Sequence, residues 1–434
     1  MRHANTQSLQ EIAAGLAGYD PQALPVAQAQ EFIARLVPRV QAVEVLPIRS
    51  ALGRVLARDI VSAIDVPAAD NSAMDGYALR SADLSLAADT VLSIAGSGFA
   101  GRPFEGAVAA GQCLRIMTGA VMPAGLDTVV PQEFVKIEGE RVTVPHGVVR
   151  AGDNRRLAGE DLARGAVALA AGRIVRPADL GLLASLGRAE VAVFRRLRVA
   201  CFSTGNELRS VGEPLDAGCV YDSNRYTLWG MLQRLGVEVL DLGVVRDDPA
   251  ALEAVFLQAA AAADAVITSG GVSVGEADHT KQVMAQLGDV LFWRIAMRPG
   301  RPMAIGRIKA GGSSNEHEAI LFGLPGNPVA VMVTFYAFVR DALLAMSGAT
   351  PQPLPMLRAA STAAIRKKPG RTEYQRGSVS RAADGSWQVT LAGSQGSGVL
   401  RSMSEANGLV VLAHAAGDVA AGEQVDVLPF DGLV

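Results

Sequence analysis

The sequence predicts a soluble α/β protein of several domains, in which small β-rich parts flank one mostly parallel central sheet. The chain has 434 residues, which is enough for two to four domains. Between residues 198 and 346, apolar strand patterns alternate with amphipathic helix patterns, as is typical of βαβ units and a parallel sheet. Before and after this region, short strands separated by Gly and Pro turns indicate small β domains.

Composition argues against several other classes of protein. The 40 basic and 43 acidic residues give a net charge of −3, so there is no basic field for nucleic acid. No apolar run approaches the roughly 20 residues of a membrane span, and residues 1–24 lack the pattern of a signal peptide. The three cysteines and five histidines show no metal-site spacing. We therefore expect a cytoplasmic protein that binds neither nucleic acid nor membrane.

The part before residue 198 has mixed character. Its predicted elements are, in order, helices over 8–16 and 27–36, a strand over 43–47, a short helix or turn over 50–56, short strands between 91 and 144 and a helix over 177–186. Residues 65–80, DVPAADNSAMDGYALR, cluster Asp, Asn, Ser, Gly and Pro and are predicted to form a loop. Asp75 precedes Gly76 there, in a loop that reaches across a subunit contact or in a simple turn.

The alternating region predicts a complete α/β domain. Its predicted elements are strands over 198–202, 238–242, 265–268, 290–295, 303–308 and 319–322, and helices over 224–235, 249–263, 279–287 and 328–346. Residues 309–318 form a polar hairpin loop, and the Pro-rich segment 350–355 is a linker to a second small β domain. Ligands of such sheets bind outside the carboxyl ends of the strands, so the loops after the strands are the candidate site.

The glycine-rich segment 269–281, SGGVSVGEADHTK, joins a strand to a helix. Its amides favour an anion, yet Glu276 and Asp278 repel one. A divalent cation between these carboxylates and a phosphate would remove the conflict. The alternative is a tight turn in which Asp278 only caps the helix. Gly270, Gly271 and Gly275 let the backbone approach a ligand closely, and the acids together with Ser269 and Ser273 favour a ligand site.

Acidic residues follow other strands of the same domain. Glu207 and Asp247 come after the first two strands, and in a parallel sheet they would converge with Asp278. Hard oxygen ligands around a phosphate suit Mg²⁺. The alternative is that each acid caps a helix, as Asp248 before Pro249 does.

Two further segments have the residue types of an oxyanion site. Arg294, Arg298 and Arg301 lie in a strand–turn–strand, and the guanidinium groups could bind an oxyanion, although a solvated turn is the alternative. In GLPGNPVA, a sharp bend would present free amides to an anion, and a plain strand-to-helix turn is the alternative. The residues of this bend are Pro325, Gly326, Asn327 and Pro328.

Seven motifs in order carry a family resemblance: DNSAMDGYALR, RIMTGA, AGED, STGNEL, YDSNRY, SGGVSVGEADHTK and GLPGNPVA. Together they resemble the molybdopterin molybdenumtransferases, the MoeA-type enzymes related to the E domain of gephyrin, over roughly residues 24 to 430. The central domain is then MoaB/MogA-like, because the smaller adenylyltransferase relatives share its SGGVSVGEAD motif. The first motif and the C-terminal β domain separate the two groups.

The resemblance implies a homodimer of four-part protomers. Its parts are an N-terminal mixed domain over 22–61 and 156–195, an inserted β-rich domain over 62–155, a molybdopterin-binding domain over 196–348 and a C-terminal β domain over 356–434. The implied substrates are adenylylated molybdopterin and molybdate. The implied reaction is Mg²⁺-dependent cleavage of the AMP phosphoanhydride, with molybdenum placed on the dithiolene and AMP released. The adenylyltransferase that acts before it is a further expected partner.

The resemblance also implies roles for individual residues. Catalytic roles fall on Asp75, Thr118, Glu207, Asp247 and Asp278, of which the last three would bind the metal. Substrate binding falls on Ser269, Gly270, Gly271, Ser273, Gly275, Arg294, Arg298, Pro325, Gly326, Asn327, Pro328 and Ser397. Arg371 and Arg376 are weaker matches, and the sequence departs from the family pattern at Asn206, at Arg294 and Arg298 where lysine is usual, and in a longer 309–318 loop.

Two rival functions are open at this point. One is a molybdopterin adenylyltransferase, which would require ATP and ignore molybdate. The other is a non-catalytic scaffold of the gephyrin kind, which would tolerate Asp278→Asn and Glu207→Gln. The sequence does not distinguish molybdate from tungstate, because the two oxyanions are nearly identical in size.

Overall fold

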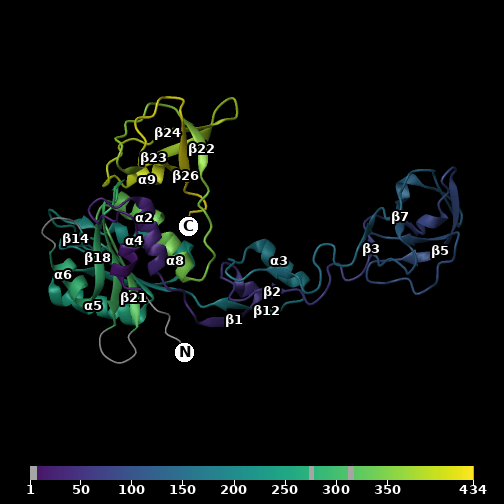
Figure 1. The fold of residues 1–434 in the computed structure, drawn as a ribbon, viewed down its shortest axis with the longest axis horizontal. Coiled ribbons are helices and arrows are strands. Elements are labelled where there is room, and N and C mark those ends of the chain that lie inside the picture. Colours follow the sequence, from purple (N-terminus) through teal and green to yellow (C-terminus); the bar gives the residue numbers. More distant parts are fainter. Residues whose placement is uncertain (1–6, 273–277, 311–316, 434) are drawn as a thin grey trace. The chain divides into compact units, whose positions relative to one another are not determined.

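A computed structural model describes residues 7–272, 278–310 and 317–433, without the side chain of Asp278 (Figure 1). The chain divides into two compact units. Unit 1 comprises residues 1–45, 53–57 and 192–434, and unit 2 comprises residues 46–52 and 58–191. Strands β1 (Val43–Pro47) and β12 (Glu190–Phe194) pair with each other, and each contains a point at which the chain passes between the units.

A six-stranded sheet forms the centre of unit 1. In spatial order its strands are β16 (Glu238–Val245), β13 (Arg198–Thr204), β17 (Ala265–Ser269), β21 (Glu318–Leu324), β20 (Pro302–Lys309) and β18 (Gly288–Arg294). The first four are parallel, and β20 runs antiparallel to both of its neighbours. The predicted mostly parallel α/β sheet is therefore confirmed, with one strand reversed by the β20–β21 hairpin.

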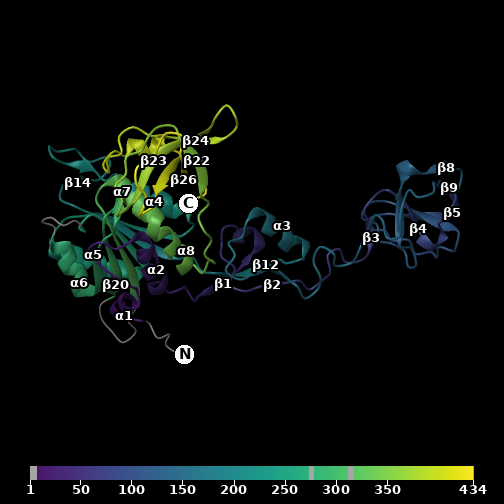
Figure 2. The same cartoon turned by 45° about the horizontal axis from the view of Figure 1, so that its top comes forward.

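Helices cover both faces of this sheet, as the two views show (Figures 1 and 2). One apolar core lies under α5 (Pro249–Ala262) and α6 (Asp278–Leu287). The other lies under α4 (Ser223–Arg234) and under α1 (Leu9–Ala14), α2 (Val26–Leu36), α7 (Pro328–Thr334) and α8 (Arg340–Met346). Each face is buried, which explains why β13, β17 and β21 are apolar along almost their whole length.

The stretch Pro328–Met346 is the central helix of the second core. Its middle, Phe335–Val339, is π-helical and joins α7 to α8. By length and composition it could cross a membrane, but 72% of its apolar window is buried inside the protein. It is therefore accounted for as a core helix of a folded domain.

The strand register brings four loops to one edge of the sheet. Thr204 at the end of β13 lies beside Val245 at the end of β16. On the other side, Ser203 pairs with Ser269, and Ser269 with Leu324. The loops after β13, β16, β17 and β21 therefore start at neighbouring positions of the carboxyl edge.

The C-terminal part of unit 1 is a small closed β domain. Its strands are β22 (Leu357–Ser361), β23 (Thr372–Arg381), β24 (Trp387–Leu391), β25 (Gly408–Leu412) and β26 (Gln424–Pro429), with a short helix α9 (Arg401–Glu405). The sheet closes because β23 pairs with both β24 and β25. Strand β19 (Met297–Arg298), which lies between β18 and β20 in the chain, pairs with β23 and ties this domain to the central one.

Unit 2 is β-rich. Its main sheet has the order β7 (Thr128–Pro131), β4 (Gly76–Leu79), β6 (Gln112–Ile116), β5 (Thr90–Gly98), β9 (Arg141–Val144) and β8 (Lys136–Glu138). Two small ribbons pair β3 (Asn71–Ser72) with β10 (Arg155–Arg156), and β2 (Ile60–Val61) with β11 (Val167–Leu169). Unit 2 also contains one α-helix, α3 (Pro177–Ser185).

The loop predicted over residues 65–80 is wrong in part. Residues 76–79 form β4, whose four residues are all buried between β6 and β7. A Cβ atom at Gly76 would lie 2.0 Å from the carbonyl oxygen of Val130. Glycine is thus present because the neighbouring strand approaches closely, and this tertiary contact overrides the turn-like local composition.

Candidate active site at the carboxyl edge of the central sheet

A cavity of about 710 Å³ opens where the carboxyl edge meets the C-terminal domain. Such a volume is typical of a small-molecule site. Its walls include the predicted residues Arg294, Arg298, Arg301, Pro325, Gly326, Asn327 and Ser397, together with Arg371, Lys281, Gln22, Trp293 and Gln395. Residues from widely separated segments of the chain therefore converge on one hollow.

The cavity is strongly basic. Arg294, Arg298 and Arg301 form no salt bridge within the described part of the chain. The backbone of Arg294 is fixed from both sides, because its N–H donates to Pro21 and its carbonyl accepts from Leu24. The cavity thus holds several positive charges that form no ion pair with any acidic side chain in the described ranges.

Arg371 contributes a further charge from the C-terminal domain. Its Nε donates to Oε1 of Glu373 at 2.8 Å, and Glu373 is only 2% exposed. This buried carboxylate orients the guanidinium at the cavity wall. Arg371, a weaker match to the family pattern, therefore lies with the stronger matches.

The segment that carries Ser397 is supported by a buried arginine. Arg376 is 0% exposed and donates to the carbonyls of Ser394, Gln395 and Gly396 and to Oγ of Ser402. Burial, and the charge of Arg298, lower its pKa. Arg376 thus shapes the loop and lies behind the wall of the cavity.

The bend after β21 forms another wall. Gly326 and Asn327 line the cavity, and their amide N–H groups donate to no group in the part of the chain that the structure describes. Pro328 begins α7 and is not among the lining residues. The bend therefore carries two unused donors beside the arginines.

The beginning of the glycine-rich segment lies next to this bend. Ser269 is 2% exposed, and its hydroxyl bonds within the protein. Gly270 and Gly271 have φ values of +94° and +69°, and a side chain on either would clash with Thr204 or Thr280. Their backbone thus needs glycine whether or not a ligand is bound.

Two carboxylates lie together farther along the same edge. Burial, and the negative charge of nearby Glu207, raise the pKa of Asp247, while a hydrogen bond from Asn206 and the charge of His279 oppose this rise. Neither carboxylate forms a salt bridge with any described residue. Glu207 curls back over Gly205, where an added Cβ atom would lie 2.7 Å from Oε2 of the glutamate.

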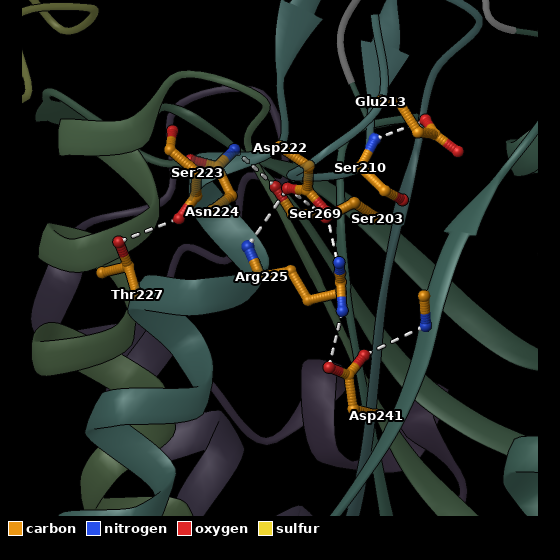
Figure 3. A network of polar contacts seen from close by, with 11 residues as sticks. Ser203, Ser210, Glu213, Asp222, Ser223, Asn224, Arg225, Thr227, Asp241 and Ser269 are labelled. Atoms are coloured by element: carbon orange, nitrogen blue, oxygen red, sulfur yellow. Dashed lines mark hydrogen bonds and ion pairs between the residues drawn. The ribbon is translucent and has the colours of Figure 1, made fainter.

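A polar network lies beneath the edge and begins at the start of α4 (Figure 3). Asp222 caps α4 and accepts hydrogen bonds from Arg225 N and from Oγ of Ser203. Arg225 spans the gap between helix and sheet, with Nε to Asp222 at 3.1 Å and Nη1 to Asp241 at 2.6 Å. This network fixes the first turn of α4 against β13 and β16.

Unit 2 contains the remaining two predicted catalytic residues. Thr118 donates from its backbone N and from Oγ1 to Oδ1 of Asp75, each at 2.7 Å. These backbone and hydroxyl hydrogen bonds lower the pKa of Asp75. The structure therefore brings Asp75 and Thr118 together on an exposed part of their own unit.

Some predicted residues lie outside the described part of the chain. These are Ser273 and Gly275, and the side chain of Asp278, whose backbone begins α6. Sequence reasoning gave no role to Asn224, Gln395 or Lys281, although YDSNRY and the glycine-rich segment were recognised as motifs. Asn224 reaches a carbonyl 102 residues away, and only the fold could reveal such a contact.

Comparison with known families assigns nearly all of the chain. The model of the MoeA N-terminal region (domain I and II) matches residues 24–187. The probable molybdopterin binding domain matches residues 200–345, and the MoeA C-terminal region (domain IV) matches residues 358–430. The three regions follow one another in the order that the sequence motifs predict.

Individual relatives agree with these matches. The molybdopterin molybdenumtransferase of Haemophilus influenzae is 41% identical over 412 residues, which cover 95% of this chain and 100% of the relative. That of Nostoc sp. is 37% identical and covers 93% of each chain. The crystal structure of the molybdopterin biosynthesis moeA protein from Pyrococcus horikoshii OT3 superposes with a TM-score of 0.78 at 27% identity, covering 94% of this chain and 100% of that chain.

Proposed function

Because the chain belongs to the molybdopterin molybdenumtransferases, the MoeA family of transferases in molybdenum-cofactor biosynthesis, we propose that it inserts molybdenum from molybdate into adenylylated molybdopterin and releases AMP. The observation that carries this proposal is the basic cavity beside the glycine-rich edge of the sheet. The family resemblance stated from the sequence is confirmed, whereas the adenylylated substrate, AMP release and Mg²⁺ dependence are our proposals.

The cavity supports molybdate binding. Molybdate is a compact dianion, and guanidinium groups and free amides are the donors that bind oxyanions. Arg294, Arg298 and Arg371 supply the first kind, and Gly326 and Asn327 supply the second. The absence of internal salt bridges for Arg294 and Arg298, within the described residues, leaves their charge available to a ligand.

The acidic pair supports Mg²⁺ binding. Burial, and the negative charge of Glu207, raise the pKa of Asp247, and a bound cation would stabilise both carboxylates in their ionised form. Within the described residues no group of three or more His, Cys, Asp and Glu side chains could hold a metal. Two carboxylates nevertheless suit Mg²⁺, which keeps several waters and binds substrate phosphates. When bound there, Mg²⁺ would neutralise charge on the phosphoanhydride.

The proposed reaction assigns a part to each group. Water adds to the AMP phosphorus as its bond to the bridging oxygen breaks, so AMP leaves and the other phosphate stays on molybdopterin. The two dithiolene thiols give up their protons and form two Mo–S bonds, while one molybdate oxygen leaves with these protons as water. Arg294, Arg298 and the Gly326–Asn327 amides hold molybdate, while Glu207 and Asp247 hold the cation that the phosphates require. No residue changes oxidation state, because molybdenum remains at the oxidation level of molybdate.

The same family membership is the basis for three further expectations. We expect a homodimer, an adenylyltransferase that supplies the adenylylated substrate, and a cytoplasmic reaction. The matches at residues 24–187 and 358–430 favour the molybdenumtransferase over the smaller adenylyltransferase, because they extend well beyond the alternating domain.

The proposal is tested with purified protein, adenylylated molybdopterin and Mg²⁺, by measuring AMP with and without molybdate. Molybdate-stimulated AMP release without ATP is expected, together with a product that activates a molybdenum enzyme lacking its cofactor. ATP-dependent adenylylation that ignores molybdate would support the adenylyltransferase. Undiminished binding to protein partners with no AMP release would support a scaffold. Parallel assays with tungstate measure the oxyanion preference.

A further inference from the structure

We infer that Asn224, in the first turn of α4, is a positioning residue that aims two amide N–H groups of the 325–327 bend into the basic cavity. The inference rests on the proposed function, because it takes molybdate as the ligand of these amides. Asn224 itself is not among the cavity-lining residues and acts through the bend.

The contacts of Asn224 fix two consecutive carbonyl groups. Its Nδ2 donates to Oγ of Ser269 at 2.8 Å (Figure 3) and to the carbonyl of Gly326 at 2.7 Å. Oγ of Ser269 in turn donates to the carbonyl of Pro325 at 3.3 Å. The carbonyls of Pro325 and Gly326 are therefore both held towards the interior, one directly and one through a serine.

The fixed directions of these two carbonyl groups determine where the amide N–H groups of the bend point. A trans peptide is planar, and its N–H points opposite to its C=O. Both peptide bonds of the bend are trans. When the carbonyls of Pro325 and Gly326 point towards Ser269 and Asn224, the N–H groups of Gly326 and Asn327 must point away from them. Those two residues line the cavity, so the N–H groups point towards it.

The amide of Asn224 has only one workable orientation. Exchanging its oxygen and nitrogen would place Oδ1 against the carbonyl of Gly326, where two acceptors would repel. In the observed orientation Oδ1 is buried without a partner among the described residues. The contribution of Asn224 is therefore confined to its two donated hydrogen bonds.

The base of α4 keeps Asn224 in place. Asp222, which is 1% exposed, caps the helix and is tied to β13 by Ser203. Arg225 adds an ion pair with Asp241 of β16. The contacts of Asp222 and Arg225, which flank Asn224 in the chain, thus hold the first turn of α4 in place and limit the movement of Asn224.

The test is Asn224→Asp, which keeps the shape of the side chain, replaces the two N–H donors by an oxygen and adds one negative charge. We expect the KM for molybdate to rise about tenfold, because two donors to a dianion are misdirected. We expect kcat and the KM for adenylylated molybdopterin to stay within about twofold, since the inference concerns only the oxyanion. Gln233→Glu, an exposed amide-to-acid change on the same helix, is the matched control and should leave all three unchanged.

A second variant, Asn224→Ala, removes the donors without adding charge and should show the same selective rise. Circular dichroism and thermal unfolding of the full chain verify that each variant folds. Wild-type kinetics for molybdate in both variants would overturn the inference while leaving the proposed function intact. A wild-type protein with no molybdate-dependent AMP release would instead overturn the proposed function. A fall in kcat together with a rise in the KM values of both substrates would show a general structural role and would also overturn the inference.

Discussion

The carboxyl edge of the central sheet has an acidic end and a basic end, and they handle charge differently. At the acidic end, burial and the neighbouring negative charge of Glu207 raise the pKa of Asp247. At the basic end, Arg294 and Arg298 line an open cavity, and Arg371 is oriented by a buried glutamate. The basic end is ready for an anion, whereas the acidic end requires a cation before an anionic substrate can approach.

This difference predicts that the two proposed substrates, adenylylated molybdopterin and molybdate, are bound by opposite means. A phosphoanhydride carries negative charge and would be repelled by Glu207 and Asp247 without a cation. Molybdate carries negative charge and would be attracted directly by the arginines. The two ends should therefore respond separately to mutation, to metal and to pH.

The largest effect is expected at the acidic end. Asp247→Asn should lower AMP release about 100-fold at saturating molybdate, because the cation loses one of its proposed carboxylate ligands. The same change should raise the melting temperature of the metal-free protein. A carboxyl whose pKa is raised by folding disfavours the folded state when ionised, and asparagine removes that cost.

The matched control for this prediction is Asp248→Asn. Asp248 carries the same charge one residue away and caps α5, a role that asparagine fills equally well. Asp248→Asn should leave the rate of AMP release and the melting temperature unchanged. Equal activity in Asp247→Asn and wild-type protein would show that the acidic pair is not a metal site.

The next largest effect is expected at the basic end. Arg298→Ala should raise the KM for molybdate about 30-fold, since a charge-assisted contact is lost. In Arg298→Lys the KM for molybdate should stay within about threefold of the wild-type value, because the positive charge, rather than the planar guanidinium geometry, holds a tetrahedral oxyanion. The KM for Mg²⁺ should not change in either variant. Steady-state assays with each ligand varied in turn measure both values.

Arg358→Ala is the control for Arg298. It removes one exposed positive charge from the same unit, where Arg358 pairs with Asp426 outside the cavity. A rise in the molybdate KM of Arg358→Ala similar to that of Arg298→Ala would mean that overall charge, and not the cavity, attracts molybdate.

A smaller effect on the KM for molybdate should come from changing Arg376, which holds the loop behind the basic end. Arg376→Met leaves the carbonyls of Ser394, Gln395 and Gly396 without their buried donor. The loop carrying Ser397 should loosen, with faster amide hydrogen exchange over 394–397 and a molybdate KM about fivefold higher. Arg381→Met, an exposed change on the same strand, should leave both unchanged. Unaltered amide hydrogen exchange over residues 394–397 in Arg376→Met would show that the arginine does not hold this loop in place.

Much of this edge could be predicted from the sequence, and the reasons differ by region. Hydrophobic period and turn residues were sufficient for the alternating strands and helices of residues 198–346. The strand order was not, because it depends on contacts that no local pattern encodes, and the meeting of Glu207 with Asp247 depends on that order. Local composition also misplaced β4, where the close approach of Val130 requires the glycine that had suggested a loop.

The cavity also shows that local sequence patterns do not encode tertiary contacts. Arg294, Arg298, the 325–327 bend and Ser397 were proposed separately, and the structure places all of them around one cavity. Their roles remain predictions. Asn224 was missed because its proposed role depends on contacts with Ser269 and Gly326, which lie 45 and 102 residues away in the sequence. The local sequence thus indicated the candidate site residues, but it did not indicate the residues that orient them.

The smallest effect is a difference in pH dependence between the two ends. The pKa of Asp247 lies above that of an ordinary aspartate, so protons compete with Mg²⁺ at a higher pH than usual. The Mg²⁺ concentration for half-maximal AMP release should therefore rise by about threefold as the pH falls from about 7.5 to about 5.5. Arginines stay protonated throughout this range, so the molybdate KM should stay constant. Asp247→Asn should abolish the pH dependence of the Mg²⁺ requirement. A molybdate KM that follows the Mg²⁺ curve would mean that the two ends share one ionisation and would remove the distinction between them.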